Sequence, residues 1–184
     1  GFLAERAQAS GGKLTTVADL IDTTPEHLTA VAAALGDAAD YIVVADEREA
    51  RAGLGILREE ERGNATFVCL DRLPKVVVGR TKSERSLAQI VVIDERFREL
   101  TDLLLGDAVL ADSADDALGA AALAESGRFV TPDGTIATAT GQIFGGSAAD
   151  GANVSIGRDE KLAAFASEIA ELEKEIVAQE LRRQ

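Results

Sequence analysis

One pattern of helix and strand signals occurs twice along this chain and limits the folds open to it. In each copy, a helix-like segment ends in Leu-Gly-Asp, and a short apolar strand, an Ala-Asp pair, a second helix, a glycine and a second strand follow. The two Leu-Gly-Asp triplets begin at Leu35 and Leu105, 70 positions apart. Strands that alternate with helices form α/β folds. The repeat therefore predicts a mixed α/β chain of two related subdomains.

Local signals predict where the elements of each copy begin. Thr24 and Pro25 are residue types preferred at the N-cap and the first position of a helix. Asp46 with Glu49 resembles a capping box, and Asp94 marks a helix start in the second copy. The first copy is expected to hold helices over 24–37 and 45–63 and strands over 41–44 and 65–70. The second is expected to hold helices over 94–107 and 111–127, strands over 108–110 and 128–131, and a glycine-punctuated strand region over 133–147.

Both ends of the sequence have the character of coiled-coil arms. Residues 158–184 contain no glycine or proline, and their apolar side chains follow the alternating 3–4 spacing of a and d positions. Residues 2–10 also favour a helix, so we expect an antiparallel pair of stubs and a sequence excerpted from a longer protein. The alternative for the C-terminal segment is an amphipathic helix packed on its own domain. The predicted a and d residues are Leu162, Phe165, Ile169, Leu172 and Ile176.

These patterns divide the chain into three parts. We expect an N-terminal stub over 1–12, a body over 13–157 and a C-terminal stub over 158–184. Within the body, the subdomains are expected at about 13–75 and 85–157.

Composition and motifs exclude most catalytic and metal-binding classes. Cys69 is the only cysteine and His27 the only histidine, which excludes a cysteine zinc site, an intrachain disulfide and most triad chemistry. The glycine-rich stretch 141–147 has no lysine before Ser147, as a phosphate-binding loop requires. Acidic pairs such as Asp115-Asp116 fall at predicted helix starts, where carboxylates cap free N–H groups. We expect no catalytic residue, no metal, no cofactor and no enzymatic activity of this domain by itself.

The charge of the chain limits its partners. A net charge of −13 argues against a surface that grips nucleic acid or an anionic membrane throughout. No run approaches the roughly 20 apolar residues of a membrane span. The only sustained basic stretch runs from Arg72 to Arg85 and holds five basic residues against one acid, Glu84. Any DNA binding is expected to be weak and salt-sensitive. The alternative is that these are solvated loop charges. The candidate DNA-binding residues are Lys13, Arg80, Lys82, Arg85, Arg158 and Lys161.

Glycines in the last β-prone stretch point to a contact between two chains. Glycine weakens a strand unless another backbone approaches closely, and an edge strand exposes unpaired N–H and C=O groups. The alternative is that these glycines form turns or bulges within one chain. The predicted dimer contact comprises Gly141, Phe144, Gly145 and Gly146.

Four stretches resemble, in order, the hinge domain of bacterial SMC (structural maintenance of chromosomes) proteins. They are 33–37 with 41–44, 63–67 with 70–73, 104–106, and 140–141 with 144–147. The resemblance covers about 13–156 and implies a half-ring that dimerises with its twin through two contacts, with arms leading to ATPase heads outside this sequence. It also implies DNA binding, a cytoplasmic, nucleoid-associated location, and kleisin-type and accessory subunits bound by other parts of the parent. The short linker over 74–80, poor in proline, and the acidic composition depart from the family pattern.

The predicted function is therefore the homodimerisation hinge of a chromosome-condensing SMC ATPase. The alternative is a small-molecule-binding α/β module of two subdomains, for which a coiled coil at both termini would have no purpose. A repair-type coiled-coil ATPase with a zinc hook would need Cys-x-x-Cys, which Cys69 alone does not supply.

Overall fold

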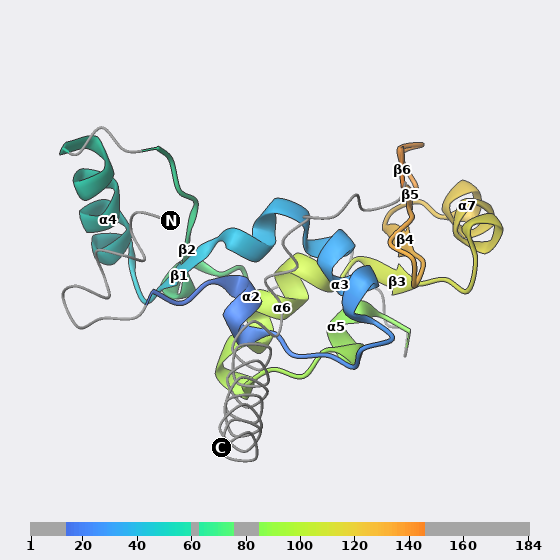
Figure 1. Cartoon of the computed structure of the whole chain (residues 1–184), viewed down its shortest axis with the longest axis horizontal. Coiled ribbons are helices and arrows are strands. Elements are labelled where there is room, and N and C mark those ends of the chain that lie inside the picture. The colour runs from blue at the N-terminus through green and yellow to red at the C-terminus, as the bar shows by residue number, and fades with distance from the viewer. Residues whose placement is uncertain (1–13, 60–62, 76–84, 146–184) are drawn as a thin grey trace, which may run out of the picture.

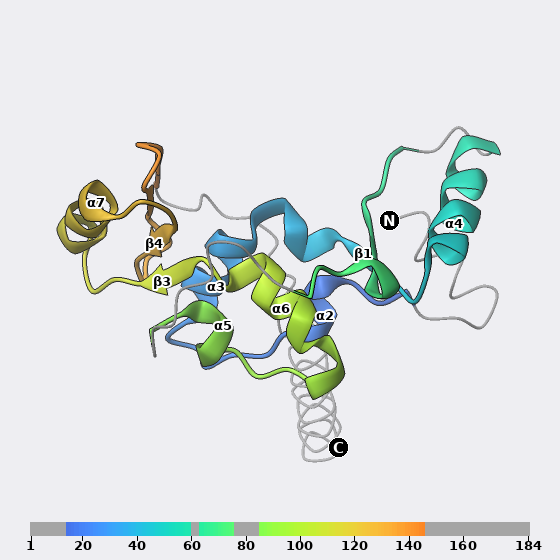
Figure 2. The ribbon, with the colours of Figure 1, turned by 180° about the vertical axis from the view of Figure 1, so that it is seen from behind.

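The computed structural model of the chain describes residues 14–59, 63–75 and 85–145. Within them, a central layer of helices lies between two lobes at opposite ends of the molecule (Figure 1). The view from behind shows the same arrangement (Figure 2). The central helices are α2 (Val17–Leu20), α3 (Leu28–Leu35), α5 (Leu87–Ile90) and α6 (Arg98–Leu105).

Each lobe combines a small sheet with one helix. The first lobe contains α4 (Glu47–Glu59) and two parallel strands, β1 (Ile42–Val44) and β2 (Phe67–Cys69). The second contains α7 (Ala114–Leu123), the parallel strands β3 (Ala108–Leu110) and β4 (Arg128–Val130), and an antiparallel extension of β5 (Ile136–Thr138) and β6 (Ile143–Phe144). Short 3₁₀ segments are η1 (Gly36–Asp40), η2 (Leu70–Arg72) and η3 (Glu95–Phe97).

The structure confirms the two related α/β subdomains. The helices α2 and α3 recur as α5 and α6, each 70 positions later, and each copy then continues as strand, helix and parallel strand. The bridge between Thr16 and Ile42 recurs between Ser86 and Val109. We call residues 14–75 the first unit and residues 85–145 the second unit, within the described parts of the chain.

The two units meet through equivalent residues. Asp22 and Val92, also 70 positions apart, form an antiparallel bridge in which each backbone N–H donates to the carbonyl of the other, at 2.9 and 2.8 Å. A reciprocal contact between equivalent residues is typical of a two-fold axis. In this chain the axis is approximate and relates the two units of one polypeptide.

One hydrophobic core spans both units. Its buried members include Val17 and Val31 from the first unit and Leu87, Leu100 and Val130 from the second. A second, smaller core lies between α7 and its sheet, and its buried side chains are alanines. They are Ala111, Ala117, Ala121 and Ala137, with Phe129 packed against them.

Arg128 adds a polar link between the units. Its guanidinium donates to the carbonyl of Ala34 at the end of α3 (2.6 Å) and to that of Leu104 at the end of α6 (2.7 Å). It also forms an ion pair with Asp107 (2.5 Å). One side chain therefore stabilises the C-terminal ends of both central helices, where helix dipoles favour a cation.

Some sequence predictions of local structure are wrong or misaligned. The helix expected from Thr24 begins at Leu28, because residues 25–27 form a turn. Asp46 caps α4 by accepting from the N–H of Glu49 (3.0 Å), as predicted. In the second unit, however, Ser113 has the capping position, and Asp112 of the matching Ala-Asp pair does not. The four-residue helices α2 and α5 were not predicted.

The remaining predictions about the chain ends cannot be compared with the structure. The coiled-coil residues Leu162, Phe165, Ile169, Leu172 and Ile176 lie outside the described residues. Within the described ranges, no helix has the length and apolar character needed to cross a membrane.

Candidate dimer interface

The strand β6 lies at one edge of the second sheet. The order of that sheet is β3-β4-β5-β6, and no further strand pairs with β6 among the described residues. Gly141 closes the β5–β6 turn with a φ of 86°, and its N–H donates to the carbonyl of Thr138 (2.9 Å). Among the described residues, the outer edge of β6 therefore has backbone groups that no strand pairs with.

Both side chains of β6 are apolar and largely exposed. Ile143 is 66% and Phe144 67% exposed. Ile143 is in register with Ala137, whose side chain packs under α7, whereas Phe144 is in register with Ile136, which packs on the main core. Since neighbouring strand residues in register share a face, the two side chains lie on opposite faces of the sheet. An edge strand that is apolar on both faces is suited to a partner that covers both.

The predicted interface glycines have different local roles. The positive φ of Gly141 is explained by the turn, which was the alternative considered for it. A Cβ at Gly145 would lie 3.1 Å from Thr135 Oγ1, so this position is already tight within one chain. Gly146 lies outside the described residues. None of these observations tests whether the glycines contact a second chain, which stays a prediction.

The first unit carries a second free edge. The outer side of β1 is occupied by the bridge from Thr16, and that of β3 by the bridge from Ser86. Among the described residues, β2 has a strand on one side only. The free edges β2 and β6 lie in the two lobes at opposite ends of the molecule (Figure 1).

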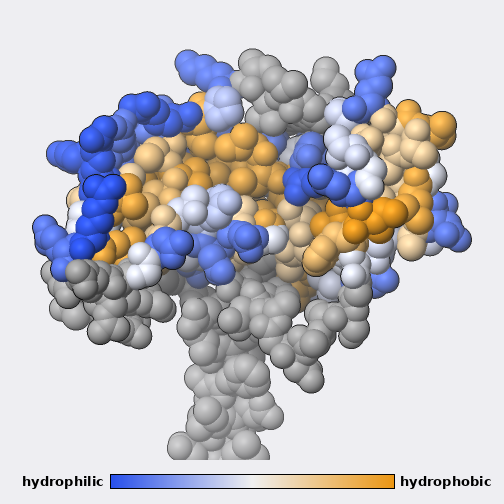
Figure 3. Space-filling model, turned by 90° about the horizontal axis from the view of Figure 1, so that it is seen from above, coloured by the Kyte–Doolittle hydropathy of each residue, from blue (hydrophilic) through white to orange (hydrophobic). Residues whose placement is uncertain are grey.

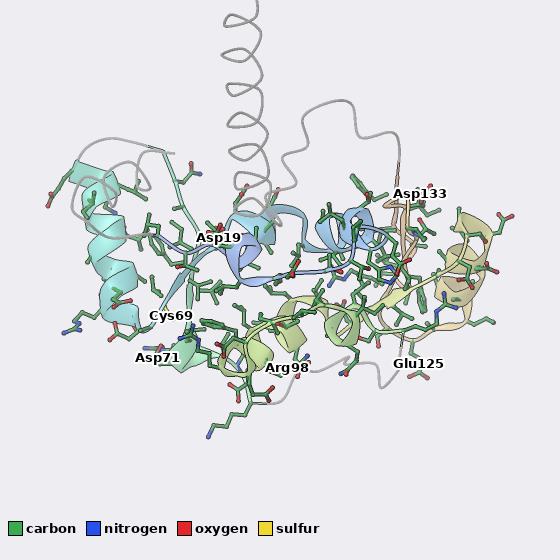
Figure 4. The ribbon with its side chains drawn as sticks, turned by 60° about the horizontal axis from the view of Figure 1, so that its bottom comes forward. Asp19, Cys69, Asp71, Arg98, Glu125 and Asp133 are labelled. Atoms are coloured by element: carbon green, nitrogen blue, oxygen red, sulfur yellow. The ribbon has the colours of Figure 1, made fainter. Side chains whose placement is uncertain are left out.

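The neighbourhood of β2 is polar and carries ion pairs. Glu47 accepts from Arg51 (2.7 Å) and from Arg72, and the hydrogen bond from Arg51, followed by the charge of Arg72, lowers the pKa of Glu47. Burial, followed by the nearby Asp71 carboxylate, raises the pKa of the Cys69 thiol. Cys69 and Asp71 lie side by side below α4, at the opposite end of the molecule from Asp133 and Glu125 (Figure 4).

Of the predicted DNA-binding residues, only Arg85 lies in the part of the chain that the structure describes. Arg85 forms a two-pronged ion pair with Asp112, at 2.5 and 3.0 Å, and this hydrogen bond raises the pKa of Arg85 and lowers that of Asp112. The charge of Arg85 is therefore partly neutralised within the chain. The other candidates, Lys13, Arg80, Lys82, Arg158 and Lys161, lie outside the described residues. DNA binding stays a prediction.

The described residues offer no cluster of three or more side chains suited to a metal ion. The acidic pairs instead have local partners. Asp94 accepts from the N–H of Arg96 (3.1 Å), and Asp116 accepts from the hydroxyl of Ser113 (2.6 Å) while its N–H donates to that hydroxyl.

Comparison with known proteins identifies the family. A model of the flexible hinge domain of SMC proteins matches residues 10–121, which cover both central helix pairs and most of α7. The chain belongs to this hinge family. The family resemblance predicted from the four sequence stretches is therefore confirmed.

The similar proteins are chromosome partition proteins. The chain is 30% identical over 175 residues to the chromosome partition protein Smc of Methanocaldococcus jannaschii, over 90% of this chain and 14% of that protein. It is 29% identical over 177 residues to Smc of Bacillus subtilis, over 89% of this chain and 15% of that protein. The chain therefore spans about a seventh of the length of these relatives.

Solved hinge domains share the fold. An asymmetric dimer of the Geobacillus stearothermophilus SMC hinge domain has a TM-score of 0.71 at 25% identity, over 94% of this chain and 73% of that one. A Pyrococcus furiosus Smc hinge domain with an extended coiled coil has a TM-score of 0.68 at 27% identity, over 98% of this chain and 67% of that one.

Two features of the candidate interface were missed in the sequence. Ile143 was not among the predicted contact residues, and the strand predicted over 65–70 was not predicted to have a free edge. For Ile143 a signal existed, because two adjacent apolar residues in a short edge strand place one side chain on each face. For β2 no signal existed, since its free edge depends on what pairs with it in space.

Proposed function

We propose that this domain is a homodimerisation hinge whose β6 strand pairs with the β2 strand of a second copy. The observation that carries the proposal is the edge strand β6, with a free backbone and with Ile143 and Phe144 two-thirds exposed on opposite faces. A strand of this kind would be a site of uncontrolled association unless a specific partner covers it. The dimeric Geobacillus relative supports the same kind of assembly.

Pairing of β6 with the partner's β2 explains why both edges are left open. Because the two edges lie in opposite lobes, two copies related by a two-fold axis would form this contact twice and close into a ring. Pairing of β6 with the partner's β6 would instead leave both β2 edges uncovered. We expect the two strand contacts together to bury roughly 1,600 Å² or more, the area typical of a stable interface.

In the parent protein, the hinge would join two coiled-coil arms. The names of the relatives support a role in chromosome partition. We expect this role to involve ATPase heads, DNA and further subunits bound by other parts of the protein, in the cytoplasm at the nucleoid. The hinge itself would act as a connector without catalytic activity.

The mass of the chain in solution tests the proposal. Light scattering at tens of micromolar should give twice the chain mass of 19.2 kDa. Phe144→Lys should give the single-chain mass with an unchanged circular dichroism spectrum, because the side chain is exposed and outside the core. The matched control is Val92→Lys, since Val92 is equally exposed, at 66%, but lies in the central layer. An unmodified chain that stays monomeric would contradict the proposal.

A further inference from the structure

Resting on the proposed dimerisation through β6, we infer that α3 of the first unit positions β6 of the second unit. The side chains that would do this lie outside β6 itself. They are Thr29 and Ala33 of α3, which contact Gly134 in the turn between β4 and β5. A helix of one unit would then set where the other unit presents its contact strand.

The turn between β4 and β5 packs directly against α3. Gly134 is buried, and a Cβ at this position would lie 3.2 Å from Thr29 Cγ2 and 3.4 Å from Ala33 Cβ. The first distance is shorter than an ordinary contact between carbon atoms. Gly134 also has a φ of 88°, a conformation that favours glycine. Only a residue without a side chain therefore lets the turn approach the helix this closely.

Hydrogen bonds within the turn hold it in one conformation. The N–H of Thr131 donates to the carbonyl of Thr135, and the N–H of Gly134 donates to the carbonyl of Thr131, both at 2.9 Å. The N–H of Thr135 donates to the hydroxyl of Thr131 (3.0 Å), which itself donates to Asp133. Thr131 is buried. A displacement of Gly134 would therefore move Thr135 as well, because otherwise several of these bonds would break.

The position of β6 follows from that of the turn. Thr135 leads into β5, where Ile136 is in register with Phe144 of β6. A Cβ at Gly145, just after β6, would lie 3.1 Å from Thr135 Oγ1. The contact strand therefore lies against the two residues that follow Gly134 in the chain.

Strand β4 is also anchored to α3. The Arg128 guanidinium donates to the carbonyl of Ala34 (2.6 Å). Val130 of β4 and Val31 of α3 are fully buried members of the main core. Together with the contact at Gly134, these interactions fix the direction in which β4 and β5 leave the core.

A small shift of β6 is enough to weaken the proposed contact. The end of the molecule with α7 and β6 is more hydrophobic than the opposite end with α4 (Figure 3). Apolar surfaces attract through close packing, and a gap of about 0.5–1 Å already forfeits a quarter to a half of a dispersion contact. A partner strand that pairs with β6 would lose both hydrogen bonds and this packing if the turn moved.

Within the described residues, the contact at Gly134 has no counterpart in the first unit. The residue 70 positions after Ala33 is Leu103 of α6, which is 37% exposed. When the copies are aligned through the bridges to β1 and β3, the counterpart of Gly134 is Arg72. A contact that the shared fold required would be expected in both units. This one fits a role specific to the unit that carries β6.

Exchanging the equivalent residues of α3 and α6 tests the positioning role. Ala33→Leu gives α3 the side chain that α6 has at Leu103, and leucine is a good helix former. We expect it to displace the turn and to raise the dimer dissociation constant about tenfold in analytical ultracentrifugation. The matched control is the reverse exchange, Leu103→Ala, which should change the constant by less than about twofold. Both variants should keep the circular dichroism spectrum of the unmodified chain.

A rescue experiment separates the contact with α3 from backbone strain. Gly134→Ala should weaken dimerisation about tenfold, through the positive φ and through the contact with Thr29 Cγ2. Adding Thr29→Ala removes that atom and should tighten the dimer again by about threefold. Strain at Gly134 alone would not respond to a change in α3, so the rescue reports the contact itself.

The two experiments distinguish the positioning role from the dimer. A chain that is dimeric but shows neither the Ala33→Leu loss nor the Thr29→Ala rescue would overturn the positioning role and leave the strand dimer standing. If Ala33→Leu does not fold, the rescue alone decides, and its absence overturns the role. An unmodified chain that is monomeric would overturn both.

Discussion

The first and second units share one fold and expose different surfaces. Among the described residues, β2 of the first unit has a strand on one side only, whereas the second unit adds the β5–β6 hairpin and ends in an exposed apolar strand. The helix α4 carries three arginines and three glutamates, whereas the charged residues of α7 are two aspartates and its exposed side chains include Leu118 and Leu123. The two related units therefore expose different surfaces. In the proposed dimer, the first unit of each chain would contact the second unit of the other, and such a contact requires two different surfaces.

Equivalent positions within the units also differ. Aligned through the bridges at Ile42 and Val109, Arg128 of the second unit stands where the first has Thr66. The carbonyl of Thr66 accepts a bond from its own unit's β1, at Ile42 (2.9 Å), whereas the Arg128 guanidinium reaches the ends of α3 and α6. Arg128 therefore adds a side-chain link between the units, beside the shared core and the Asp22–Val92 bridge, that has no counterpart in the first copy.

Replacing Arg128 should show this difference most strongly. Arg128→Met would leave the Asp107 carboxylate and two helix carbonyls without their donor, and we expect a loss of about 2–3 kcal/mol in the free energy of unfolding, less than for a fully buried pair. Chemical denaturation measures it. The control Thr66→Val should change the free energy by no more than about 0.5 kcal/mol. Equal losses for both variants would contradict the asymmetry.

Two glycines of α4 should respond to alanine with opposite signs. Gly55 has open space around a Cβ, so Gly55→Ala should stabilise by about 0.5–1 kcal/mol through helix propensity. At Gly53 the Cβ would overlap the Phe67 ring, so Gly53→Ala should destabilise by about 1–2 kcal/mol despite the same propensity. Thermal denaturation of the pair separates packing from propensity. In α7, Gly119→Ala should behave like Gly55→Ala, because nothing lies near its Cβ either.

Acid should weaken both units through lowered carboxyl pKa values. Hydrogen bonds from Arg51 to Glu47, from Arg85 to Asp112 and from Thr131 to Asp133 lower the pKa of each acceptor. Because the folded pKa is below the unfolded value, these groups stabilise the fold above about pH 4, and their contribution is lost as the pH falls through the folded values. The denaturant midpoint should therefore decline below about pH 4. In Asp112→Asn the denaturant midpoint should decline less steeply below that pH. A pH profile identical to that of the unmodified chain would show that the Arg85–Asp112 pair does not contribute to this decline.

The smallest expected effect is a change in the reactivity of Cys69. Burial raises its pKa, so its reaction with a disulfide reagent near pH 8 should be slower than that of an unfolded control. Since Cys69 belongs to β2 and the second unit has Thr131 at the equivalent position, this thiol reports on the first unit alone. In the proposed dimer the rate should fall further as protein concentration rises. A rate independent of concentration would argue against β2 as a contact strand.

Much of the fold could be predicted from the sequence because residues close together in the chain indicate where the elements of each repeat begin and end. Glycines end helices, and short apolar runs such as Ala108–Leu110 form strands where predicted. The misaligned Ala-Asp pair shows the limit of such signals. Asp46 caps α4 and Ser113 caps α7. Because the capping residue differs between the units, aligning the two Ala-Asp pairs gave the wrong equivalent position.

The missed features are those that depend on distant partners. Four-residue helices such as α2 and α5 have too few residues for a periodic pattern, and their stability comes from the shared core. Arg128 read as an ordinary strand residue, because its acceptors at Ala34 and Leu104 are remote in sequence. For the candidate interface, glycine and strand propensity pointed to the edge strand and to Phe144 but missed its exposed neighbour Ile143.

The bridge between Asp22 and Val92 has a consequence for how the proposed ring comes apart. A reciprocal bond between equivalent residues is what the seam of a homodimer looks like, but here both partners belong to one polypeptide and to one continuous core. The proposed ring would thus contain four α/β units. Contacts between the two units of one chain would alternate around it with strand contacts between the two chains. The contact between the two units of one chain persists at any dilution, because the units are covalently connected and share a core. The strand contacts between chains depend on protein concentration. The ring should therefore open only where β6 of one chain separates from β2 of the other, while the two units within each chain stay in contact.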